Sequence, residues 1–202
     1  MAIIIVGGGG RGAGKTALVC GLMRALPEIA WTAVKVTTHE HGHEHGKPTP
    51  IWEETESGEG SDTGRYLAAG ARRAFLVTTG LVTAGEDAPG PGDDTLRRIV
   101  QQVLRECLPT GGSVKAGATP CGVIFESNSV LRHLRPDVCL CAATSPWGHE
   151  KPSYDLVAER MDAMVELAAH DHIIEAERLT FRLASLERVS PTMQEWLRER
   201  LA

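Results

Sequence analysis

One segment near the start of the chain limits the possible folds more than any other. Residues 9–16 read Gly-Gly-Arg-Gly-Ala-Gly-Lys-Thr and match the pattern G-x-x-x-x-G-K-[ST] in full. Residues 2–6 before this segment are apolar and mostly β-branched, and residues 15–26 after it have a helical pattern. A buried strand, a glycine-rich loop and a helix in this order are the setting in which the pattern binds phosphate. We therefore expect an α/β protein with a three-layer P-loop NTPase fold and a mainly parallel sheet.

The rest of the chain continues the alternation of strands and helices. Apolar runs bounded by turn residues predict further strands at 31–36, 73–78, 121–126, 137–143 and 172–175. Helical spacing and capping residues predict helices at 62–70 with Asp62 as cap, from Asp93 or Asp94 to 107, at 154–169 and from 190 onward. Residues at about 37–61 have no apolar periodicity and predict one long flexible loop. No linker or internal repeat divides the chain, so we expect a single nucleotide-binding domain over residues 1–202.

Charge and hydropathy exclude two classes of partner. The 21 Lys and Arg residues against 26 Asp and Glu residues give a net charge of −5, and no Lys/Arg-rich tract is present. Nucleic-acid binding needs a basic face, so we expect no nucleic-acid partner. The apolar run at 2–6 is far shorter than the roughly 20 residues of a membrane span, and it lacks the basic leader of a signal peptide. We therefore expect no membrane partner and a cytoplasmic location.

The five cysteines predict reduced thiols in the core. Their number is odd, and they lie mostly within apolar stretches, as is typical of a cytosolic protein. Cys139 and Cys141 lie two residues apart on a predicted strand, so their side chains face the same side. A metal site of the zinc-knuckle type would need a different spacing and a second ligand pair. We interpret these residues as core cysteines.

The glycine-rich loop contributes the candidate nucleotide-binding residues. Glycines let successive backbone N–H groups face inward around a phosphate, and the positive end of the following helix strengthens the field. Lys15 can reach the β- and γ-phosphates, and the Thr16 hydroxyl can ligate Mg²⁺. The predicted cofactor-binding residues are Gly9, Gly10, Arg11, Gly12, Ala13, Gly14, Lys15 and Thr16. A plain tight connection or a dinucleotide-binding turn is the alternative interpretation of these glycines.

An acidic residue is needed beside this loop to organise the metal or the attacking water. Glu126 ends a buried strand, and strand ends converge on the nucleotide in this topology. We therefore predict Glu126 as a metal ligand together with Thr16, and as a catalytic residue together with Lys15. A helix-capping or surface carboxylate is the alternative. The polar turn 127–129, Ser-Asn-Ser, follows and can contact phosphate or substrate.

Four segments together resemble a known family. They are the phosphate loop at 9–16, Ala33-Val34-Lys35 before a His-bearing loop, Asp62-Thr63-Gly64-Arg65 with Ala69-Gly70-Ala71, and Phe125-Glu126-Ser127-Asn128. In this order, over about residues 1–145, the chain is similar to the molybdopterin-guanine dinucleotide biosynthesis protein B family. Members of that family are P-loop proteins that bind GTP and assist the attachment of a nucleotide to molybdopterin. The longer His stretch, the extended acidic loop before Asp62 and the last fifty or so residues depart from the family pattern.

The resemblance carries expectations about the site and its partners. It implies GTP and Mg²⁺ as cofactors, and it implies Asp62 as a catalytic residue near the γ-phosphate and the metal. Thr63 and Arg65 would fix that segment. An enzyme of molybdenum-cofactor biosynthesis as partner and a homodimer are also implied. On the residues alone, Asp62 as a helix N-cap and Arg65 as a solvated helix residue are equally good interpretations.

A histidine-rich stretch follows the second predicted strand. Its histidines alternate with Glu and Gly and are His39, His41, His43 and His45. An extended chain would project these side chains to one side, and neutral imidazoles bind Zn²⁺ or Ni²⁺. A flexible, solvated loop is the alternative, and the acidic residues 53, 54, 56 and 59 are predicted to belong to the same loop.

Three functions are compatible with these patterns. The first is an Mg²⁺-dependent GTP-binding protein with weak GTPase activity, acting as an adaptor in molybdenum-cofactor biosynthesis. The second is nucleotide-driven delivery of Ni²⁺ or Zn²⁺ from the histidine-rich stretch. The third is an ATP-dependent small-molecule kinase, with its acceptor hydroxyl near Glu126 or Asn128. No Asn-Lys-x-Asp sequence is present to read guanine, so the choice of GTP over ATP comes from the resemblance alone.

Overall fold

The structure is a computed structural model that describes residues 1–10, 12–37, 51–78, 91–107, 119–143 and 153–202. Its strands are β1 (Ala2–Gly8), β2 (Ala30–Thr37), β3 (Ile51–Glu54), β4 (Arg73–Thr78), β5 (Cys121–Glu126), β6 (Val138–Ala143), β7 (Ala163–Leu167), β8 (His172–Glu175) and β9 (Leu179–Leu183). Its helices are α1 (Lys15–Ala25), α2 (Asp62–Ala68), α3 (Pro91–Cys107), the short 3₁₀ helix η1 (Ser129–Arg132), α4 (Tyr154–Ala158) and α5 (Pro191–Leu201).

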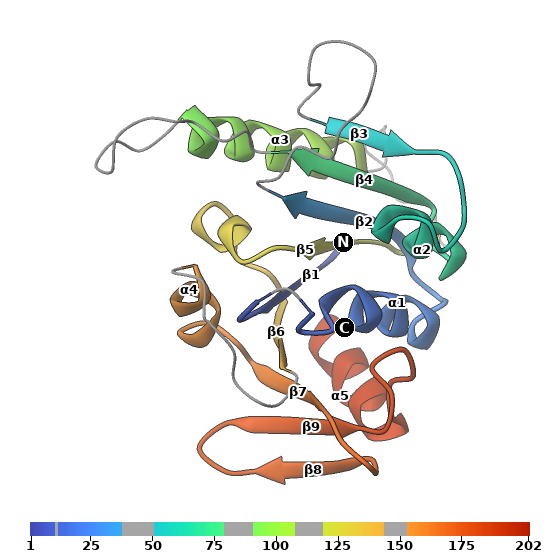
Figure 1. Ribbon diagram of the computed structural model, residues 1–202, viewed down its shortest axis with the longest axis vertical. Coiled ribbons are helices and arrows are strands. Elements are labelled where there is room, and N and C mark those ends of the chain that lie inside the picture. Colours follow the sequence, from blue (N-terminus) through green and yellow to red (C-terminus); the bar gives the residue numbers. More distant parts are fainter. Residues whose placement is uncertain (11, 38–50, 79–90, 108–118, 144–152) are drawn as a thin grey trace.

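The strands of the described part of the chain form one nine-stranded sheet in the order β3-β4-β2-β5-β1-β6-β7-β9-β8, as Figure 1 shows. Neighbouring strands from β4 to β9 pair in parallel. The edge strands β3 and β8 are antiparallel to β4 and β9. Parallel neighbours require crossover connections, and these connections place helices on both faces of the sheet. The predicted α/β fold with a mainly parallel sheet is confirmed.

Helices cover both faces of the sheet and enclose two apolar cores. One core combines residues of α1, α2 and α5 with one face of the sheet, and the other combines residues of α3, η1 and α4 with the opposite face. The central strand β1 contributes to both, because Ile4 and Val6 face the first core and Ile5 faces the second. All three side chains are fully buried. The apolar run at 2–6 is therefore the strand buried on both faces that the sequence predicts.

The last third of the chain differs from the prediction. The helix predicted at 154–169 is wrong beyond its first turns: α4 ends at Ala158, and residues 163–167 form β7. In β7 the buried Val165 pairs with Ala142 of β6 and Phe181 of β9, so the strand satisfies the backbone of both neighbours. Leu167, which helical spacing would bury, is 53% exposed. Pairing with distant strands outweighed the local helical spacing in this segment.

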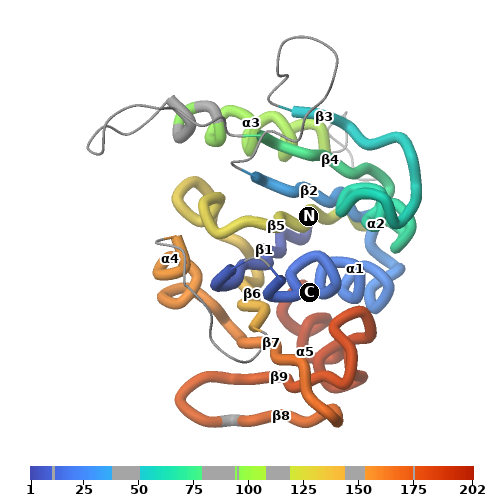
Figure 2. Tube along the Cα trace, viewed as in Figure 1, coloured from blue at the N-terminus to red at the C-terminus, as the bar shows by residue number. Residues whose placement is uncertain are grey.

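The C-terminal part adds a hairpin and a capped helix. The strand predicted at 172–175 is β8, but it is followed by β9, which the sequence analysis did not predict. The terminal helix α5 begins as predicted, with Ser190 accepting a hydrogen bond from the Met193 N–H and Pro191 in the first turn. Leu197 is fully buried, and the Trp196 ring lies 5.3 Å from that of Phe181. Helix α5, in red in Figure 2, lies beside the end of α1, where the Gln194 amide donates to the Ala25 carbonyl.

The predicted loop at 37–61 is wrong at its end. Residues 51–54 form the edge strand β3, and the Glu53 carboxylate accepts from Arg73 Nε at 2.7 Å. Glu54 accepts hydrogen bonds from Ser61 and Thr63, both at 3.0 Å. These two acidic residues are therefore paired rather than merely solvated. Two apolar residues followed by two Glu residues on a four-residue edge strand show no alternation that would reveal a strand. Residues 38–50, with the four histidines, lie outside the described part.

Two helix starts also differ from the prediction. Ser61, not Asp62, is the N-cap of α2, since its hydroxyl accepts from the Gly64 N–H at 2.9 Å. Asp62 is the first helical residue. Helix α3 starts at Pro91, so Asp93 and Asp94 lie inside the helix instead of capping it. None of the helices in the described ranges is both long and apolar enough to span a membrane.

A glycine of α1 lets the C-terminal part approach this helix closely. A Cβ atom on Gly21 would press against the carbonyl oxygen of Leu186, a backbone atom that cannot turn away. Ala is favoured over Gly in a helix by about 1 kcal/mol, but overpacking costs about 1 to 3 kcal/mol. We expect Gly21→Ala to lower the free energy of unfolding by roughly 1 kcal/mol or more in a urea titration. Gly60→Ala, where a Cβ meets no atom within 4 Å, is the control, and an equal loss in both variants would contradict this packing.

The buried thiols predict a pattern of chemical labelling. Burial raises the pKa of Cys20 to about 11 and that of Cys139 to about 12. Because the thiolate is the reactive form, iodoacetamide at pH 8 should spare both residues in the folded protein and label the half-buried Cys121 first. The unfolded chain loses these protons near pH 8.5, so stability should fall as the pH rises from about 8.5 toward 11. Equal labelling of all cysteines, read by peptide mass spectrometry, would disagree with this core.

Candidate functional site

The phosphate loop leaves the sheet at its centre. It follows β1, which lies between β5 and β6 and ends at Gly8. Gly12 and Gly14 have φ angles of 78° and 79°, a left-handed backbone that favours glycine, and Ala13 between them is 8% exposed. Gly14 is also the N-cap of α1, so the loop runs directly into the helix whose first N–H groups can bind an anion. Arg11 lies outside the described residues.

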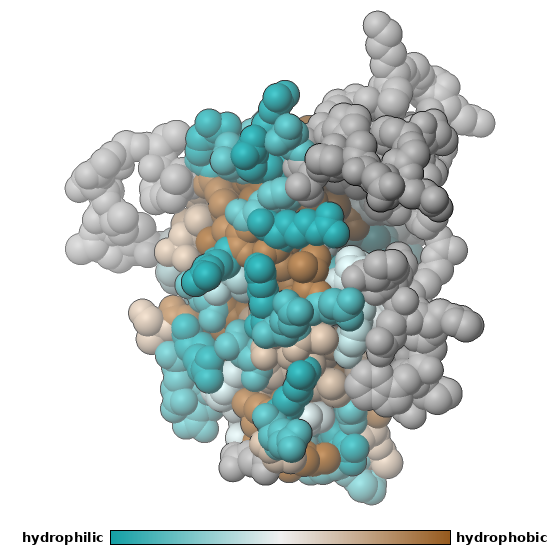
Figure 3. All heavy atoms as spheres, turned by 90° about the vertical axis from the view of Figure 1, so that its left-hand side faces the viewer, coloured by the Kyte–Doolittle hydropathy of each residue, from teal (hydrophilic) through white to brown (hydrophobic). Residues whose placement is uncertain are grey.

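The strand ends that carry this loop face one side of the molecule. In Figure 1 the arrows of β2 and β4 point to the left, and Figure 3 turns that side toward the viewer. Hydrophilic residues, in teal, and apolar residues, in brown, are mixed across the described part of this face. Both kinds of surface are therefore present where parallel strands end, which is where ligands bind in open α/β sheets.

The first two side chains of α1 point to different partners. Lys15 Nζ donates to the carbonyl oxygen of Gly10 at 2.6 Å, so the side chain folds back over the loop. Thr16 Oγ1 donates to Glu126 Oε2 at 2.8 Å. Lys15 thus places its ammonium on the loop, and Thr16 places its hydroxyl against Glu126 at the end of β5.

Glu126 is the most enclosed polar group of the site. The residue is 5% exposed, and its carboxylate accepts hydrogen bonds from Thr16, from the Tyr66 hydroxyl and, at 3.0 Å, from Lys35 Nζ. These donors come from α1, α2 and β2. A buried carboxylate is tolerated because such partners replace its water. Of the two interpretations of Glu126, the structure therefore favours the buried site residue over a surface carboxylate.

Lys35 joins Glu126 to Asp62. Lys35 stands directly opposite Glu126 in the register of β2 and β5, so both side chains project from the same face of the sheet. The Lys35 ammonium also pairs with the carboxylate of Asp62, at the start of α2. The structure thus brings the predicted residues Thr16, Glu126 and Asp62 together. Lys35, which lies between the two carboxylates, entered the sequence analysis only as part of the family resemblance.

The pairing sets the charge of these groups. Burial alone would lower the pKa of Lys35, but attraction by Glu126 and the hydrogen bond to Asp62 outweigh it and raise the pKa above its usual value. Burial would raise the pKa of Asp62, but the hydrogen bond from Lys35 and the charge of that ammonium hold it below its usual value. Lys35 is therefore protonated and Asp62 ionised at neutral pH.

Tyr66 is a site residue that sequence reasoning missed. Its ring is fully buried, and its hydroxyl donates to Glu126 Oε2. Burial, together with the adjacent Glu126 charge, raises the pKa of Tyr66 well above its usual value, so the phenol stays a donor. The available signal was its position four residues after Asp62, one turn along α2 and on the same face.

Arg65 and Thr63 fix α2 to its surroundings. Arg65 Nη2 donates to Glu187 at 2.7 Å, and the same carboxylate accepts from Arg24 of α1 at 2.9 Å. Thr63 is 4% exposed and donates to Glu54 of β3 at 3.0 Å. Arg65 is therefore not merely a solvated helix residue: these contacts tie the helix that carries Asp62 to β3, to α1 and to the segment before α5.

Asn128 holds the start of the phosphate loop. Its amide oxygen accepts from the Gly8 N–H at 3.0 Å, and its Nδ2 donates to the Gly8 carbonyl at 3.1 Å. Nδ2 also reaches the Ser153 hydroxyl at 3.4 Å. The side chain is engaged with backbone, whereas the sequence analysis considered it for contact with phosphate or substrate.

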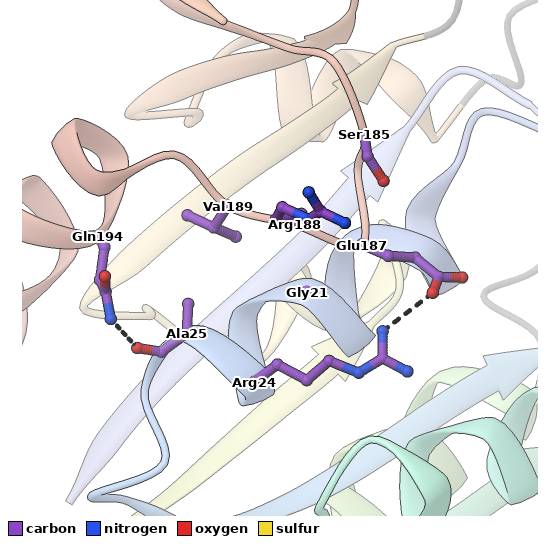
Figure 4. Close-up of a pocket in the computed structure, with 8 residues that line it drawn as sticks. All are labelled: Gly21, Arg24, Ala25, Ser185, Glu187, Arg188, Val189 and Gln194. Carbon is purple, nitrogen blue, oxygen red and sulfur yellow. Dashed lines mark hydrogen bonds and ion pairs between the residues drawn. The ribbon is translucent and has the colours of Figure 1, made fainter.

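A pocket of about 490 Å³ lies away from these residues, at the far end of α1 from the loop. Figure 4 shows the side chains that surround it, among them Arg24 and its partner Glu187. They are Gly21, Arg24, Ala25, Ser185, Glu187, Arg188, Val189 and Gln194. None of the predicted site residues lines this pocket, so it contributes nothing to the candidate site.

The donors beside the loop fit magnesium better than a softer metal. The Thr16 hydroxyl and the carboxylates of Glu126 and Asp62 offer oxygen atoms, which Mg²⁺ prefers when it is bound together with phosphates. In the described ranges no group of three or more His, Cys, Asp and Glu side chains is arranged to hold a metal. A Zn²⁺ or Ni²⁺ site therefore has no support in these ranges, and the histidine-rich stretch lies outside them.

Comparisons with known proteins show the fold. No protein-family model and no curated protein matches the sequence. The solved structure of LpxK from Aquifex aeolicus in complex with ATP has a TM-score of 0.51 at 16% identity, covering 90% of this chain and 53% of that chain. This chain thus spans about half the length of LpxK. MobB from Bacillus subtilis has a TM-score of 0.42 at 16% identity, covering 100% of this chain and 99% of that chain. The chain has the P-loop NTPase fold.

The two hydrogen bonds between Asn128 and the Gly8 backbone, here called the Asn128 clamp, give a test of the framework of the site. Asn128→Asp replaces the Nδ2 donor by an oxygen that would face the Gly8 carbonyl, so one hydrogen bond becomes a repulsion. We expect the free energy of unfolding to fall by about 1 to 3 kcal/mol in a urea titration. Ser129→Ala is the control, because it removes only the hydroxyl contact with the neighbouring Ser127. Equal stability of Asn128→Asp and the wild type would mean that the clamp contributes nothing.

Proposed function

We propose that this chain binds a nucleoside triphosphate with Mg²⁺ at the phosphate loop and hydrolyses it slowly. The observation that carries the proposal is the meeting of Thr16, Glu126 and Asp62 at the N-terminus of α1, beside the loop that holds Lys15. Phosphoryl transfer needs a backbone that binds phosphate, a lysine such as Lys15 that reaches the phosphates, and oxygen ligands for a metal.

Each residue has a role that follows from its position. The N–H groups of residues 12–16 bind phosphate oxygens, and Lys15 exchanges the Gly10 carbonyl for them. The Thr16 hydroxyl donates a hydrogen bond to Glu126, so the lone pairs of its oxygen remain for the metal. Glu126 and Asp62 hold the metal directly or through its water. Bound Mg²⁺ would neutralise the charge that develops on the phosphates.

Slow hydrolysis follows from the state of the carboxylates. A general base must have a lone pair within reach of the attacking water. Glu126 already accepts from Thr16, Tyr66 and Lys35, and Asp62 is paired with Lys35. Each carboxylate therefore has few lone pairs left for a proton of the attacking water, and we expect hydrolysis to be slow.

We further propose GTP as the nucleotide and an adaptor role in molybdenum-cofactor biosynthesis. The support is the resemblance of four segments to the molybdopterin-guanine dinucleotide biosynthesis protein B family. Three of those segments lie far apart in the sequence, yet Lys35 of one pairs with Asp62 and Glu126 of the other two, and Glu126 contacts Thr16 of the fourth, the loop. Their joint position makes chance similarity of separate short motifs a poor explanation. A kinase would use the same phosphate site with ATP, so ATP is the comparison nucleotide.

We expect Lys15→Ala to weaken binding of Mg²⁺-GTP at least about 100-fold, because two charged phosphate contacts are lost. Calorimetric titration of GTP and of ATP, each with and without Mg²⁺, into the wild type and the variant measures this. Arg24→Ala removes the same charge from the last turn of the same helix and should leave the affinity unchanged.

The outcomes separate the alternatives. Preference for GTP that depends on Lys15 supports the proposal, and preference for ATP favours the kinase. Binding of neither nucleotide by the folded wild type would refute nucleotide binding altogether, while equal losses in Lys15→Ala and Arg24→Ala would show an effect of net charge alone.

A further inference from the structure

The position that a metal would occupy beside Glu126 and Asp62 already holds a positive charge. Lys35 Nζ pairs with Asp62 and lies 3.0 Å from Glu126 Oε1. The Lys35 side chain is 17% exposed and that of Glu126 is 6% exposed, so water does little to screen this pair. The ammonium is therefore a close counter-ion of both carboxylates, and water screens it least from Glu126, because the Asp62 side chain is 39% exposed.

The fold fixes the face of the sheet from which Lys35 projects. Lys35 alternates with Val34 and Val36, which belong to or pack against the core on the opposite face of the sheet. Its register partner is Glu126 on one side and Leu76 on the other. Only a one-residue shift of β2 would move Lys35 to the opposite face, so its place on the face that carries Glu126 is built into the sheet, while its long side chain can still turn on that face.

A divalent cation and this ammonium compete for the same oxygens. Glu126 Oε1 is engaged by Lys35, and Oε2 is engaged by Thr16 and Tyr66. A metal that binds either carboxylate directly must displace the ammonium or tolerate its repulsion at short range. Phosphate oxygens supply the compensation, because they attract both the metal and a displaced ammonium.

We propose that Lys35 is a resident counter-ion that keeps divalent metal out of the site until a triphosphate arrives. Without nucleotide, Lys35 neutralises Asp62 and Glu126, and free Mg²⁺ binds weakly. With nucleotide, the ammonium turns from the carboxylates to a terminal phosphate oxygen, and the metal takes its place. Metal and nucleotide therefore bind together. This inference concerns the metal site of the proposed function and rests on it.

The test measures metal binding with no nucleotide present, using Mn²⁺ as the probe and its free-ion EPR signal as the readout. Lys35→Met keeps the length of the side chain and removes the charge. We expect it to bind one Mn²⁺ about tenfold more tightly than the wild type or better, since it removes one positive charge at ion-pair distance.

Two further variants control for charge and for site. Arg73 also bridges two carboxylates, those of Glu53 and Glu106, but on the surface and away from the loop. Arg73→Met changes the net charge equally and should leave Mn²⁺ affinity at the wild-type level. The double variant Lys35→Met with Asp62→Asn removes one carboxylate with the ammonium and should lose most of the gain.

Thermal unfolding keeps the inference testable if Lys35→Met folds poorly. Its melting temperature should rise with Mn²⁺ far more than that of the wild type, because a ligand of the folded state stabilises it by mass action. Equal Mn²⁺ affinity in the wild type and Lys35→Met, with no extra thermal stabilisation, would overturn the inference. So would an equal gain in Arg73→Met.

The result is independent of nucleotide binding. If the wild type binds Mg²⁺-GTP through Lys15 but Lys35→Met gains no metal affinity, the proposed function stands and the counter-ion role is wrong. If Lys35→Met gains Mn²⁺ but the wild type binds no nucleotide, the counter-ion occupies a metal site with another purpose, and the coupling to a triphosphate is overturned.

Discussion

A single buried carboxylate holds the site together. Glu126 is 5% exposed, and a charge in such a place is costly unless hydrogen-bond donors surround it. Thr16, Lys35 and Tyr66 supply those donors from three separate elements. The need to satisfy this one group therefore fixes α1, β2 and α2 relative to the end of β5. Replacing it by an apolar residue would leave two hydroxyls without their acceptor and Lys35 with Asp62 alone, so Glu126 shapes the site before any ligand binds.

Local rules were enough to predict the framework. The strand, glycine-rich loop and helix over residues 2–25 follow from β-branched residues, from glycines that adopt a left-handed backbone and from helix formers, all within one short stretch. The same holds for the cap and first turn of α5, where Ser190 and Pro191 act on their immediate neighbours. Glu126 could be predicted because it is the last residue of a buried strand, and the ends of parallel strands meet at the edge where ligands bind. These features depend on residues close together in the sequence, which is why pattern reasoning reached them.

The features that were missed depend on distant partners. β7 forms because β6 and β9 offer their edges to Val165, although its local spacing suits a helix. β3 is recognisable only through β4, which pairs with Trp52 and its neighbours. Lys35 becomes a site residue through the register that sets it opposite Glu126, and Tyr66 through the packing of α2 against β2 and β4. No periodicity within one segment contains this information, because it arises when the sheet is assembled.

The packing of α5 has a consequence for the nascent chain. Met193 and Leu197 are fully buried in the same cluster as Leu18 and Leu22 of α1. During translation α1 leaves the ribosome long before residues 191–201 do, and N-terminal parts of a chain begin to fold first. The part of the cluster that α5 covers must therefore stay exposed after the described residues of the phosphate site have left the ribosome. A chain stalled before Pro191 would expose that apolar area to chaperones and proteases, although the sequence of its phosphate loop would already be complete.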